Sequence, residues 1–431
     1  MNETVNTHKK MEELDKMSIP YEAIPPSEWK SNAYDSNNSV SLETLCIFYK
    51  CARDLEKVIE EQEGDEKEVE EYIINLLSLI LTQKLHLIVY HDRWLYFFNG
   101  KYFEPCPSKK ELQCILRELC EAAAYLWKRF SVHDKTVKRL LSHVQQNAVK
   151  VDYPPDISKY VVFENGVLNL DTLELEDFTP QKFFTSMIHA DWLAENKACP
   201  EYEKVINTYT NHEAPLNKRI NEVLGVCLTN DMVKKLFCFL GVTNSGKTFL
   251  LSFLMRLFNN SATVTMQPND LGRQFAPSMV YGKSLCCCMD MDSAPLNTKA
   301  TAFLKGISGA DMLSAEFKGE NGSVPFQSRA HIINASNYDI TTKMPDAAFD
   351  MRKLVIPFKY RLTDNAEPFE VLMDKLEREK AAIVRKLILA YKALKDNHYE
   401  FSDSEEGESY DSYVPPTAVS RSTSKSLDFF F

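Results

Sequence analysis

Residues 236–248 read Leu-Phe-Cys-Phe-Leu-Gly-Val-Thr-Asn-Ser-Gly-Lys-Thr. A protein binds a nucleoside triphosphate with backbone N–H groups that turn inward, an ammonium group on the β and γ phosphates, and a hydroxyl on the Mg2+. Gly241 and Gly246 permit that backbone path. Lys247 carries the ammonium group, and Thr248 carries the hydroxyl. The stretch therefore predicts a phosphate-binding loop for a nucleoside triphosphate and its metal ion.

The segments on either side of this loop favour the same interpretation. An apolar run precedes the loop, and the amphipathic run over residues 249–258 follows it as a helix whose N-terminus would face the phosphates. The alternative is a glycine turn between a core strand and a helix that binds nothing. Strands and helices alternate from residue 234 to about residue 362, which predicts a parallel α/β sheet covered by helices.

A second apolar run, over residues 284–292, ends in acids and reads Ser-Leu-Cys-Cys-Cys-Met-Asp-Met-Asp. A buried strand of this kind brings a carboxylate beside the phosphates, where it can organise Mg2+ and a water molecule. Asp290 and Asp292 point to opposite faces of a strand, so we expect only one of them to meet the metal directly. The alternative is a pair of surface acids in a loop.

A third apolar run, over residues 330–337, ends in an amide. It reads Ala-His-Ile-Ile-Asn-Ala-Ser-Asn, and it lies about as far beyond the acids as the acids lie beyond the loop. The side chain of Asn337 can both donate and accept a hydrogen bond, so it can sense the γ-phosphate and orient the attacking water. The alternative is an ordinary turn residue.

A cation precedes a fourth apolar run. Residues 346–358 read Asp-Ala-Ala-Phe-Asp-Met-Arg-Lys-Leu-Val-Ile-Pro-Phe. Arg352 can reach the γ-phosphate held by a neighbouring subunit and stabilise charge in the transition state. The alternative is a surface arginine paired with Asp346 or Asp350.

Composition limits the class of protein. The chain has 431 residues, of which 44% are hydrophobic, which is enough for two or three domains with proper cores. The formal net charge is −11, so contact with nucleic acid needs a local basic surface rather than the field of the whole molecule. One local cluster consists of Lys128, Arg129, Lys135, Lys138 and Arg139, and it is either a solvated helix face or a DNA contact.

The cysteines predict a reduced intracellular protein without structural zinc. They are scattered, without paired C-x-x-C spacing, and the polar N-terminus has no signal peptide pattern. The three adjacent cysteines at 286–288 are expected to be core residues of a buried strand. Residues 72–89 are apolar but interrupted by polar side chains, so we expect a buried helix and a strand there and no membrane span.

The motif series resembles a superfamily 3 helicase. The resemblance rests on the Gly-x-x-Asn-x-Gly-Lys-Thr loop, the strand ending in Asp, the Ser-Asn strand tip, and Asp-x-x-Phe-x-x-Arg before Val-Ile-Pro-Phe. Three further elements are similar to the helicase part of poxvirus-type primase-helicases, which also occur in phages and mobile elements. They are Leu-Lys-Gly-Ile-Ser-Gly-Ala-Asp at 304–311, Leu-Gly-Val-Cys-Leu-Thr-Asn-Asp at 224–231, and Asn-Gly-Val-Leu at 165–168. The resemblance covers roughly residues 155–395.

The resemblance implies an AAA+-like P-loop NTPase domain that binds ATP and Mg2+. The residues that would bind the nucleotide are Gly241, Val242, Thr243, Asn244, Ser245, Gly246, Lys247 and Thr248. Those implied in catalysis are Lys247, Asp290, Asp292, Asn337 and Arg352, and those on the metal are Thr248, Asp290 and Asp292. The family often has Glu where Asp292 stands, so which acid acts on the metal or the water stays open.

The family also implies a ring, commonly a hexamer of the chain with itself, that moves 3′ to 5′ on single-stranded DNA by hairpins in its channel. The equivalent hairpin would lie within residues 316–322, with Lys318 and Asn321 on the DNA. The family commonly continues beyond the position of Phe431 into a DNA-binding module, so we expect DNA loading to be weak or to depend on a partner. Neither a primase centre nor a nicking centre is evident, so a separate primase or polymerase is an expected partner.

Six segments are expected along the chain. They are a disordered arm over 1–40, a mainly helical α+β domain over 41–150 with a hairpin turn at Asn99-Gly100, a linker and helical collar over 151–232, the superfamily 3 ATPase domain over 233–362, a C-terminal helix over 363–400, and an acidic disordered tail over 401–431. The leading hypothesis is an ATP-dependent DNA helicase that acts in the replication of a virus or mobile element, in the nucleus or at a viral replication site. The alternatives are a P-loop NTPase without unwinding activity and an inactive DNA-binding or scaffold descendant.

Overall fold

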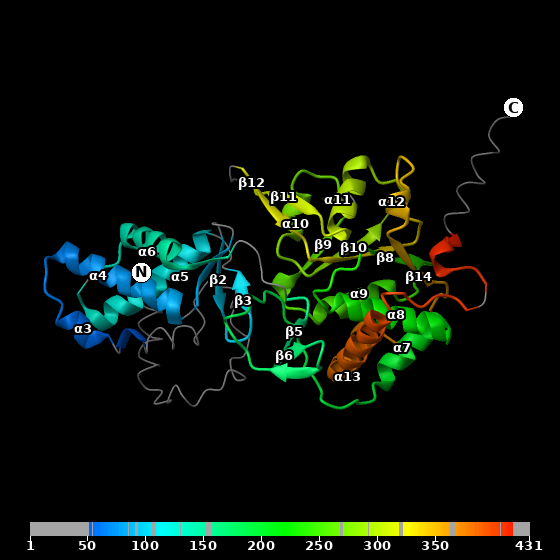
Figure 1. The fold of residues 1–431 in the computed structure, drawn as a ribbon, viewed down its shortest axis with the longest axis horizontal. Coiled ribbons are helices and arrows are strands. Elements are labelled where there is room, and N and C mark those ends of the chain that lie inside the picture. The colour runs from blue at the N-terminus through cyan, green and yellow to red at the C-terminus, as the bar shows by residue number, and fades with distance from the viewer. Residues whose placement is uncertain are drawn as a thin grey trace. The chain divides into compact units, whose positions relative to one another are not determined.

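The computed structural model describes residues 51–53, 55–84, 86–90, 94–105, 109–129, 131–151, 157–267, 270–291, 293–318, 322–362, 367–405 and 407–416. The chain forms two compact units (Figure 1). The first comprises Met1–Pro155 with Phe178–Thr185, and the second comprises Asp156–Asp177 with Ser186–Phe431. No helix in the described part of the chain combines the length and the apolar character that a membrane crossing needs.

The first unit is a mixed sheet that shares its core with three helices. The helices are α4 (Glu66–Leu79), α5 (Lys109–Trp127) and α6 (Asp134–Asn147), accompanied by the short α3 (Glu56–Glu60) and the π-helical turn η3 (Ile80–Lys84). The sheet has the order β3 (Phe103–Pro105), β2 (Trp94–Phe98), β1 (Ile88–Tyr90), β4 (Val149–Val151), and only the β1–β4 pair is parallel. Ile73, Leu95 and Leu119 belong to one buried cluster, so helices and strands pack together.

The turn between β2 and β3 confirms the hairpin expected at Asn99-Gly100. The side-chain oxygen of Asn99 accepts hydrogen bonds from the backbone N–H groups of Lys101 and Tyr102, both at 3.0 Å. Gly100 has a φ of 95°, which a residue with a side chain rarely adopts.

Part of the acidic run before α4 starts that helix. The carboxylate of Asp65 accepts hydrogen bonds from the backbone N–H groups of Lys67 and Glu68, both at 2.9 Å. The carboxylate of Glu68 accepts the N–H of Asp65 in return. This reciprocal capping satisfies donors that would otherwise lack partners in the first turn of a helix.

The second unit contains the predicted parallel sheet. Its five strands have the order β14 (Lys353–Phe358), β8 (Leu236–Gly241), β13 (His331–Ser336), β10 (Leu285–Met291) and β9 (Thr263–Met266), and every neighbouring pair is parallel. Helices on both faces bury such a sheet, so β8 and β13 are buried at every position, including the polar side chains of His331, Asn334 and Ser336 in β13.

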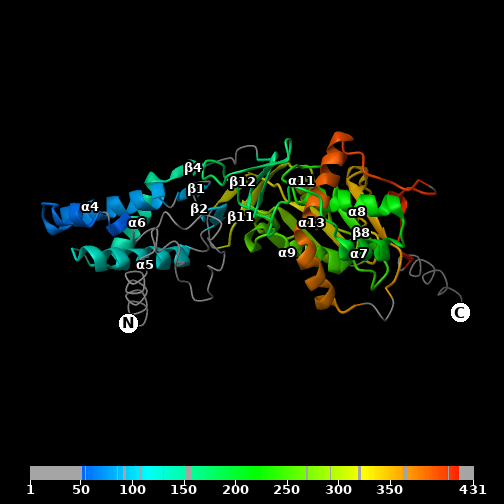
Figure 2. The same ribbon diagram turned by 90° about the horizontal axis from the view of Figure 1, so that it is seen from below.

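Helices cover both faces of this sheet (Figure 1). One face carries α7 (Pro200–Thr210), α8 (Ala214–Cys227), α9 (Lys247–Arg256) and α13 (Phe369–Asp396), and the other carries α10 (Ala276–Val280) and α11 (Thr298–Ser308). Seen from below, α13 lies against α7 and α8 (Figure 2). In β10 the side chain of Cys287 joins the α8–α13 core, whereas Cys286 and Cys288 join the α10–α11 core. This alternation confirms the prediction that the adjacent cysteines are core residues of a strand.

Smaller elements complete the second unit. An antiparallel sheet of β5 (Tyr160–Phe163), β6 (Gly166–Asn169) and β7 (Glu174–Glu176) precedes α7. A hairpin of β11 (Met312–Glu316) and β12 (Ser323–Gln327) follows α11. The short helices are α12 (Ala347–Asp350) and the 3-10 turns η4 (Asn260–Ala262) and η6 (Tyr410–Ser412).

The first residues of the expected acidic tail pack on the second unit, which differs from the disorder expected there. Arg219 of α8 is 1% exposed, and its guanidinium donates hydrogen bonds to the carbonyl of Ser402, at 2.9 Å, and to the carboxylate of Asp411. That carboxylate also accepts the N–H of Val355 on the edge strand β14, at 2.8 Å. The carboxylate of Asp411 therefore pairs with a buried cation and accepts a hydrogen bond from the edge strand of the sheet.

Candidate functional site

Four of the parallel strands end at one edge of the sheet. Leu240 of β8 pairs with Ser336 of β13, Gly241 pairs with Phe358 of β14, and Met291 of β10 pairs with Ser336. The segments that follow these strands therefore meet at the same edge, which is where ligands bind in open α/β sheets.

The loop that leaves β8 needs glycine at two positions. A Cβ atom on Gly241 would lie 2.0 Å from the carbonyl oxygen of Phe358, which accepts the N–H of Val242 at 3.1 Å. Gly246 has a φ of 93°, and a Cβ there would lie 2.3 Å from the ring of Tyr209. The loop is thus pressed between β14 and α7, and a larger residue at either glycine would push it out of place.

Lys247 is the first residue of α9, and its side chain folds back over the loop. It is 7% exposed, and its ammonium donates hydrogen bonds to the carbonyls of Gly241, at 3.1 Å, and Val242, at 2.7 Å. It also donates to the hydroxyl of Ser245 at 3.1 Å. A buried cation at the N-terminus of a helix, beside backbone N–H groups, favours an anion at this place.

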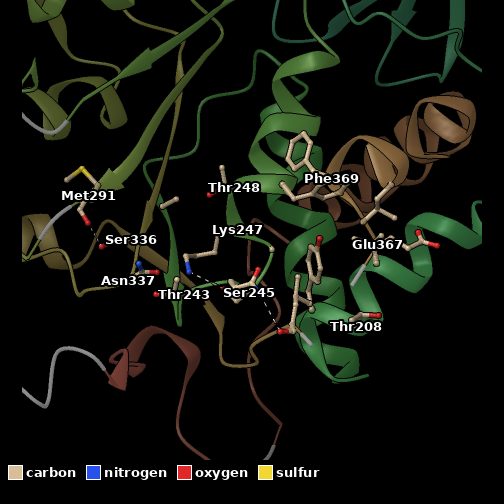
Figure 3. A pocket seen from close by; sticks show the side chains of 18 of the residues that line it. Thr208, Thr243, Ser245, Lys247, Thr248, Met291, Ser336, Asn337, Glu367 and Phe369 are labelled. Carbon is tan, nitrogen blue, oxygen red and sulfur yellow. Dashed lines mark hydrogen bonds between the residues drawn. The ribbon is translucent and has the colours of Figure 1, made fainter. Parts of the chain in front are cut away.

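A cavity of about 730 Å³ opens at the loop (Figure 3). Its lining includes Thr243, Asn244, Ser245, Gly246, Lys247 and Thr248, together with Ala335 and Ser336 at the end of β13 and Asn337 and Tyr338 just after it. The structure therefore brings the predicted loop residues and the predicted amide into one cavity. Gly241 and Val242, the first two residues of the predicted loop, do not line the cavity, and their carbonyl groups accept hydrogen bonds from Lys247.

The end of β10 also reaches the cavity. Met291 lines it, and its carbonyl accepts a hydrogen bond from the hydroxyl of Ser336 at 2.8 Å. That hydroxyl in turn accepts the N–H of Tyr338 at 2.9 Å, which fixes the turn that carries Asn337. The backbone of Asp290 lies in β10 immediately before Met291. The side chain of Asp290 and the whole of Asp292 lie outside the described residues.

Arg352 lies elsewhere in the unit. Its guanidinium donates hydrogen bonds to the carbonyl of Lys305 and, at 3.4 Å, to the hydroxyl of Ser308, both in the last turn of α11. A cation is favoured there because the last carbonyls of a helix are unpaired and carry partial negative charge. Asp346 pairs with Lys305 at 2.7 Å and Asp350 pairs with Lys353 at 3.1 Å, so the alternative pairing of Arg352 with these acids is not what the structure shows.

The segment expected to meet DNA joins β11 and β12. Lys318 is exposed just after β11, and the two strands are antiparallel as a hairpin requires. Asn321 lies outside the described residues.

The basic cluster of the first unit is partly engaged within that unit. Arg139 forms ion pairs with Glu70, at 3.0 Å, and with Glu71. Arg129 donates hydrogen bonds to three backbone carbonyls between residues 59 and 62. These two side chains stabilise contacts within the first unit, so the cluster is not simply the solvated helix face that the sequence offers as the alternative to a DNA contact.

The other half of the cavity lining comes from residues that the sequence motifs did not indicate. They are Lys204, Val205, Thr208 and Tyr209 of α7, Phe249 of α9, Leu362 after β14, Glu367 just before α13, and Phe369 and Leu372 in its first turn. Burial raises the pKa of Tyr209, so its hydroxyl stays neutral. A hydrogen bond from Lys375 lowers the pKa of Glu367, which keeps that carboxylate charged. No local pattern marks these residues, because folding alone brings α7 and α13 to the loop.

Comparisons with known proteins match two parts of the chain. A family described as D5 N terminal like matches residues 78–211, and a family of unknown function, DUF5906, matches residues 239–352. Each match covers less than half of the chain. No curated protein matches it.

Solved structures are also similar to it at low identity. One is an A form apo structure of the NrS-1 C terminal region, with 14% identity, a TM-score of 0.48, and coverage of 75% of this chain and 74% of that one. Another apo structure of that region has 13% identity, a TM-score of 0.48, and coverage of 80% and 76%. Residues from both matched segments line the cavity. Helix α7 lies in the segment that matches the D5 N terminal like family, and the loop, Ser336 and Asn337 lie in the segment that matches the family of unknown function.

Proposed function

We propose that this chain binds ATP with Mg2+ in the cavity at the sheet edge, hydrolyses it, and uses the energy to move along single-stranded DNA as a ring-forming replicative helicase. The observation that carries the proposal is that Lys247, Thr248 and Asn337 line one cavity although their motifs are far apart in the sequence. Its volume of about 730 Å³ lies within the range of small-molecule sites.

Each of these residues has a role in the proposed reaction. Lys247 binds the β and γ phosphates, and the N–H groups of the loop and of the first turn of α9 surround them. Asn337 orients the attacking water, and an acid at the end of β10, Asp290 or Asp292, accepts its proton. The glycines at 241 and 246 keep the loop thin enough for this close approach.

The residues present suit Mg2+. Among the described residues no cluster of three or more His, Cys, Asp or Glu side chains is arranged to hold a metal ion. Mg2+ in a nucleotide site does not need one, because it keeps several waters and binds one or two protein oxygens together with the phosphates. Thr248 would supply a hydroxyl, and Asp290 or Asp292 a carboxylate. The ion would neutralise charge that develops on the phosphate oxygens.

Three findings support the wider role. A parallel sheet of five strands with helices on both faces suits the AAA+-like P-loop domain that the sequence resemblance implies. The match of residues 78–211 is to the N-terminal family of primase-helicases, which favours a part in viral or mobile-element DNA replication. Arg352 points to the end of α11 rather than into the cavity of its own chain, which suits contact with a neighbouring subunit.

Steady-state ATP hydrolysis tests the proposal. The purified full chain should turn over ATP, single-stranded DNA should stimulate the rate, and Lys247→Ala should lower it by about 100-fold or more, as the loss of a preorganised charge on the reacting group does. Lys299→Ala is the matched control, because Lys299 is an exposed lysine of α11 and should leave the rate unchanged.

Two results would contradict this function. An unchanged rate in Lys247→Ala would exclude ATP chemistry at this loop. Turnover that DNA does not stimulate would favour an NTPase without unwinding activity.

A further inference from the structure

The cavity has two chemically different ends. Figure 3 shows Ser336 and Asn337 on one side of Lys247, and Glu367 and Phe369 on the other. The second end, between α7 and α13, is lined by the side chains of Val205, Tyr209, Leu362, Phe369 and Leu372, with the polar side chains of Lys204, Thr208 and Glu367 beside them. A phosphate chain needs only the first end, so the second end has room for a different part of the ligand.

Phe369 places a partly exposed aromatic ring at this end. It is the first residue of α13, and 42% of it is exposed. Because Phe369 also lines the cavity, its partly exposed ring offers an apolar contact surface to a bound ligand. Its ring stands edge-on to that of Phe249, with centroids 5.3 Å apart and an interplanar angle of 78°. Phe249 lies two residues after Lys247 on α9, so this contact sets the position of the Phe369 ring relative to the phosphate-binding lysine.

Ion pairs and hydrogen bonds hold the two helices of this end together. The carboxylate of Glu379 on α13 accepts the backbone N–H groups of Glu201, at 3.2 Å, and Tyr202, at 3.1 Å, at the start of α7. Lys375 of α13 pairs with Glu201 at 3.3 Å and with Glu367 at 2.6 Å. The end is therefore formed before a ligand arrives, so binding need not order it.

We propose that the α7–α13 end of the cavity binds the base of the nucleotide, and that the ring of Phe369 packs on that base. This inference rests on the proposed nucleotide-binding function. A nucleotide joins an anionic chain to a flat aromatic base with polar edges, and the cavity joins a cationic loop to an end that combines aromatic and aliphatic side chains with a few polar ones. Aromatic side chains hold bases through their π faces with little dependence on which base is present. Phe369 is then the residue that distinguishes a nucleotide from an inorganic polyphosphate.

Calorimetric binding of two probes to the full chain tests this assignment. The probes are ATP and inorganic tripolyphosphate, each with Mg2+, because tripolyphosphate has the phosphate chain and lacks the base. Phe369→Ala should weaken ATP binding by about tenfold, the usual effect of losing one base–aromatic contact, and should leave tripolyphosphate binding unchanged. Phe369→Trp keeps an aromatic face and should retain the affinity for ATP.

Val371→Ala is the matched control. Val371 is an apolar residue of the same helix, 49% exposed, and it does not line the cavity, so its removal should leave both affinities unchanged. Equal affinities for ATP in Phe369→Ala and Val371→Ala would overturn the assignment, and so would an equal loss of both probes in Phe369→Ala. A wild-type chain that binds neither probe would instead overturn the proposed function itself.

Discussion

His331 is a buried, uncharged histidine at the start of β13. It is 2% exposed, and its Nε2–H donates a hydrogen bond to the carbonyl of Thr229 at 3.1 Å. Burial lowers its pKa from 6.5 to about 4, and the hydrogen bond and the charge of Asp231 oppose only part of that effect. The imidazolium is therefore much less stable in the folded protein than in the unfolded chain.

This burial predicts that stability falls as the pH drops below 6.5. Between pH 6.5 and about 4 the unfolded chain binds a proton at His331 and the folded protein does not, so the free energy of unfolding decreases with falling pH. From pH 7 to pH 5 the loss due to this group should be about 2 kcal/mol. His331→Gln keeps a hydrogen-bond donor and does not titrate, so urea unfolding should show about 2 kcal/mol less pH dependence in the variant. Equal pH dependence in both proteins would contradict the burial of this histidine.

At the level of elements, local patterns predicted the strands and loops that carry motifs. β8 with its glycine loop, β10 and β13 were predictable because an apolar run followed by Gly, Asp or Asn is a signal within one short segment. The positions of α7 and α13 were not, because the contacts of Tyr209 with Gly246 and of Phe369 with Phe249 join segments that no local pattern connects. The tertiary fold therefore brings about half of the lining residues to the cavity, and no local sequence pattern marks them.

In the C-terminal segment, the amino-acid composition did not indicate the packing that the structure shows. Its acids predicted a solvated tail, but the buried guanidinium of Arg219 has the carboxylates of Asp403, at 3.7 Å, and Asp411 as partners. Tyr410 is buried beside them, and its hydroxyl donates a hydrogen bond to Glu213 at 2.5 Å. This charged segment packs on the second unit because its carboxylates pair with the buried guanidinium of Arg219 on α8.

Asp411→Ala should therefore destabilise the second unit. The variant removes one partner of a buried arginine and leaves the N–H of Val355 on β14 without its acceptor. We expect a loss of about 2 kcal/mol in the free energy of unfolding, less than for a fully buried pair because the Asp411 side chain is 42% exposed. Glu408→Ala, at an exposed acid of the same segment, should change the stability little. Chemical unfolding measures both, and equal stabilities would show that the segment does not support the sheet edge.

At the level of the whole molecule, charge limits how the chain can meet DNA. The formal net charge of −11 repels a phosphate backbone at long range, so a contact needs cations gathered at one place. Two arginines of the basic cluster in the first unit are engaged in helix contacts. Lys318, exposed after β11, would be repeated around a ring of identical chains, which multiplies a single local cation into a row of phosphate contacts.

The proposed ring would give Arg352, which does not line the cavity of its own chain, a place beside the nucleotide of a neighbouring subunit, and this makes the assembly testable. If Arg352 acts on the nucleotide of a neighbour, Lys247→Ala and Arg352→Ala chains are each inactive alone, but a mixed ring contains sites with an intact lysine from one chain and an intact arginine from the next. Random mixing in equal amounts should make about one site in four complete, so the mixture should regain a measurable part of the wild-type ATP hydrolysis.

Mixing Lys247→Ala with a Lys247→Ala, Arg352→Ala double variant is the control, because no site in that mixture has an intact lysine. Recovery in the first mixture alone would place Arg352 at a shared site. A first mixture as inactive as the control would instead leave Arg352 with the role that its hydrogen bonds already describe, which is to cap the last turn of α11 within its own chain.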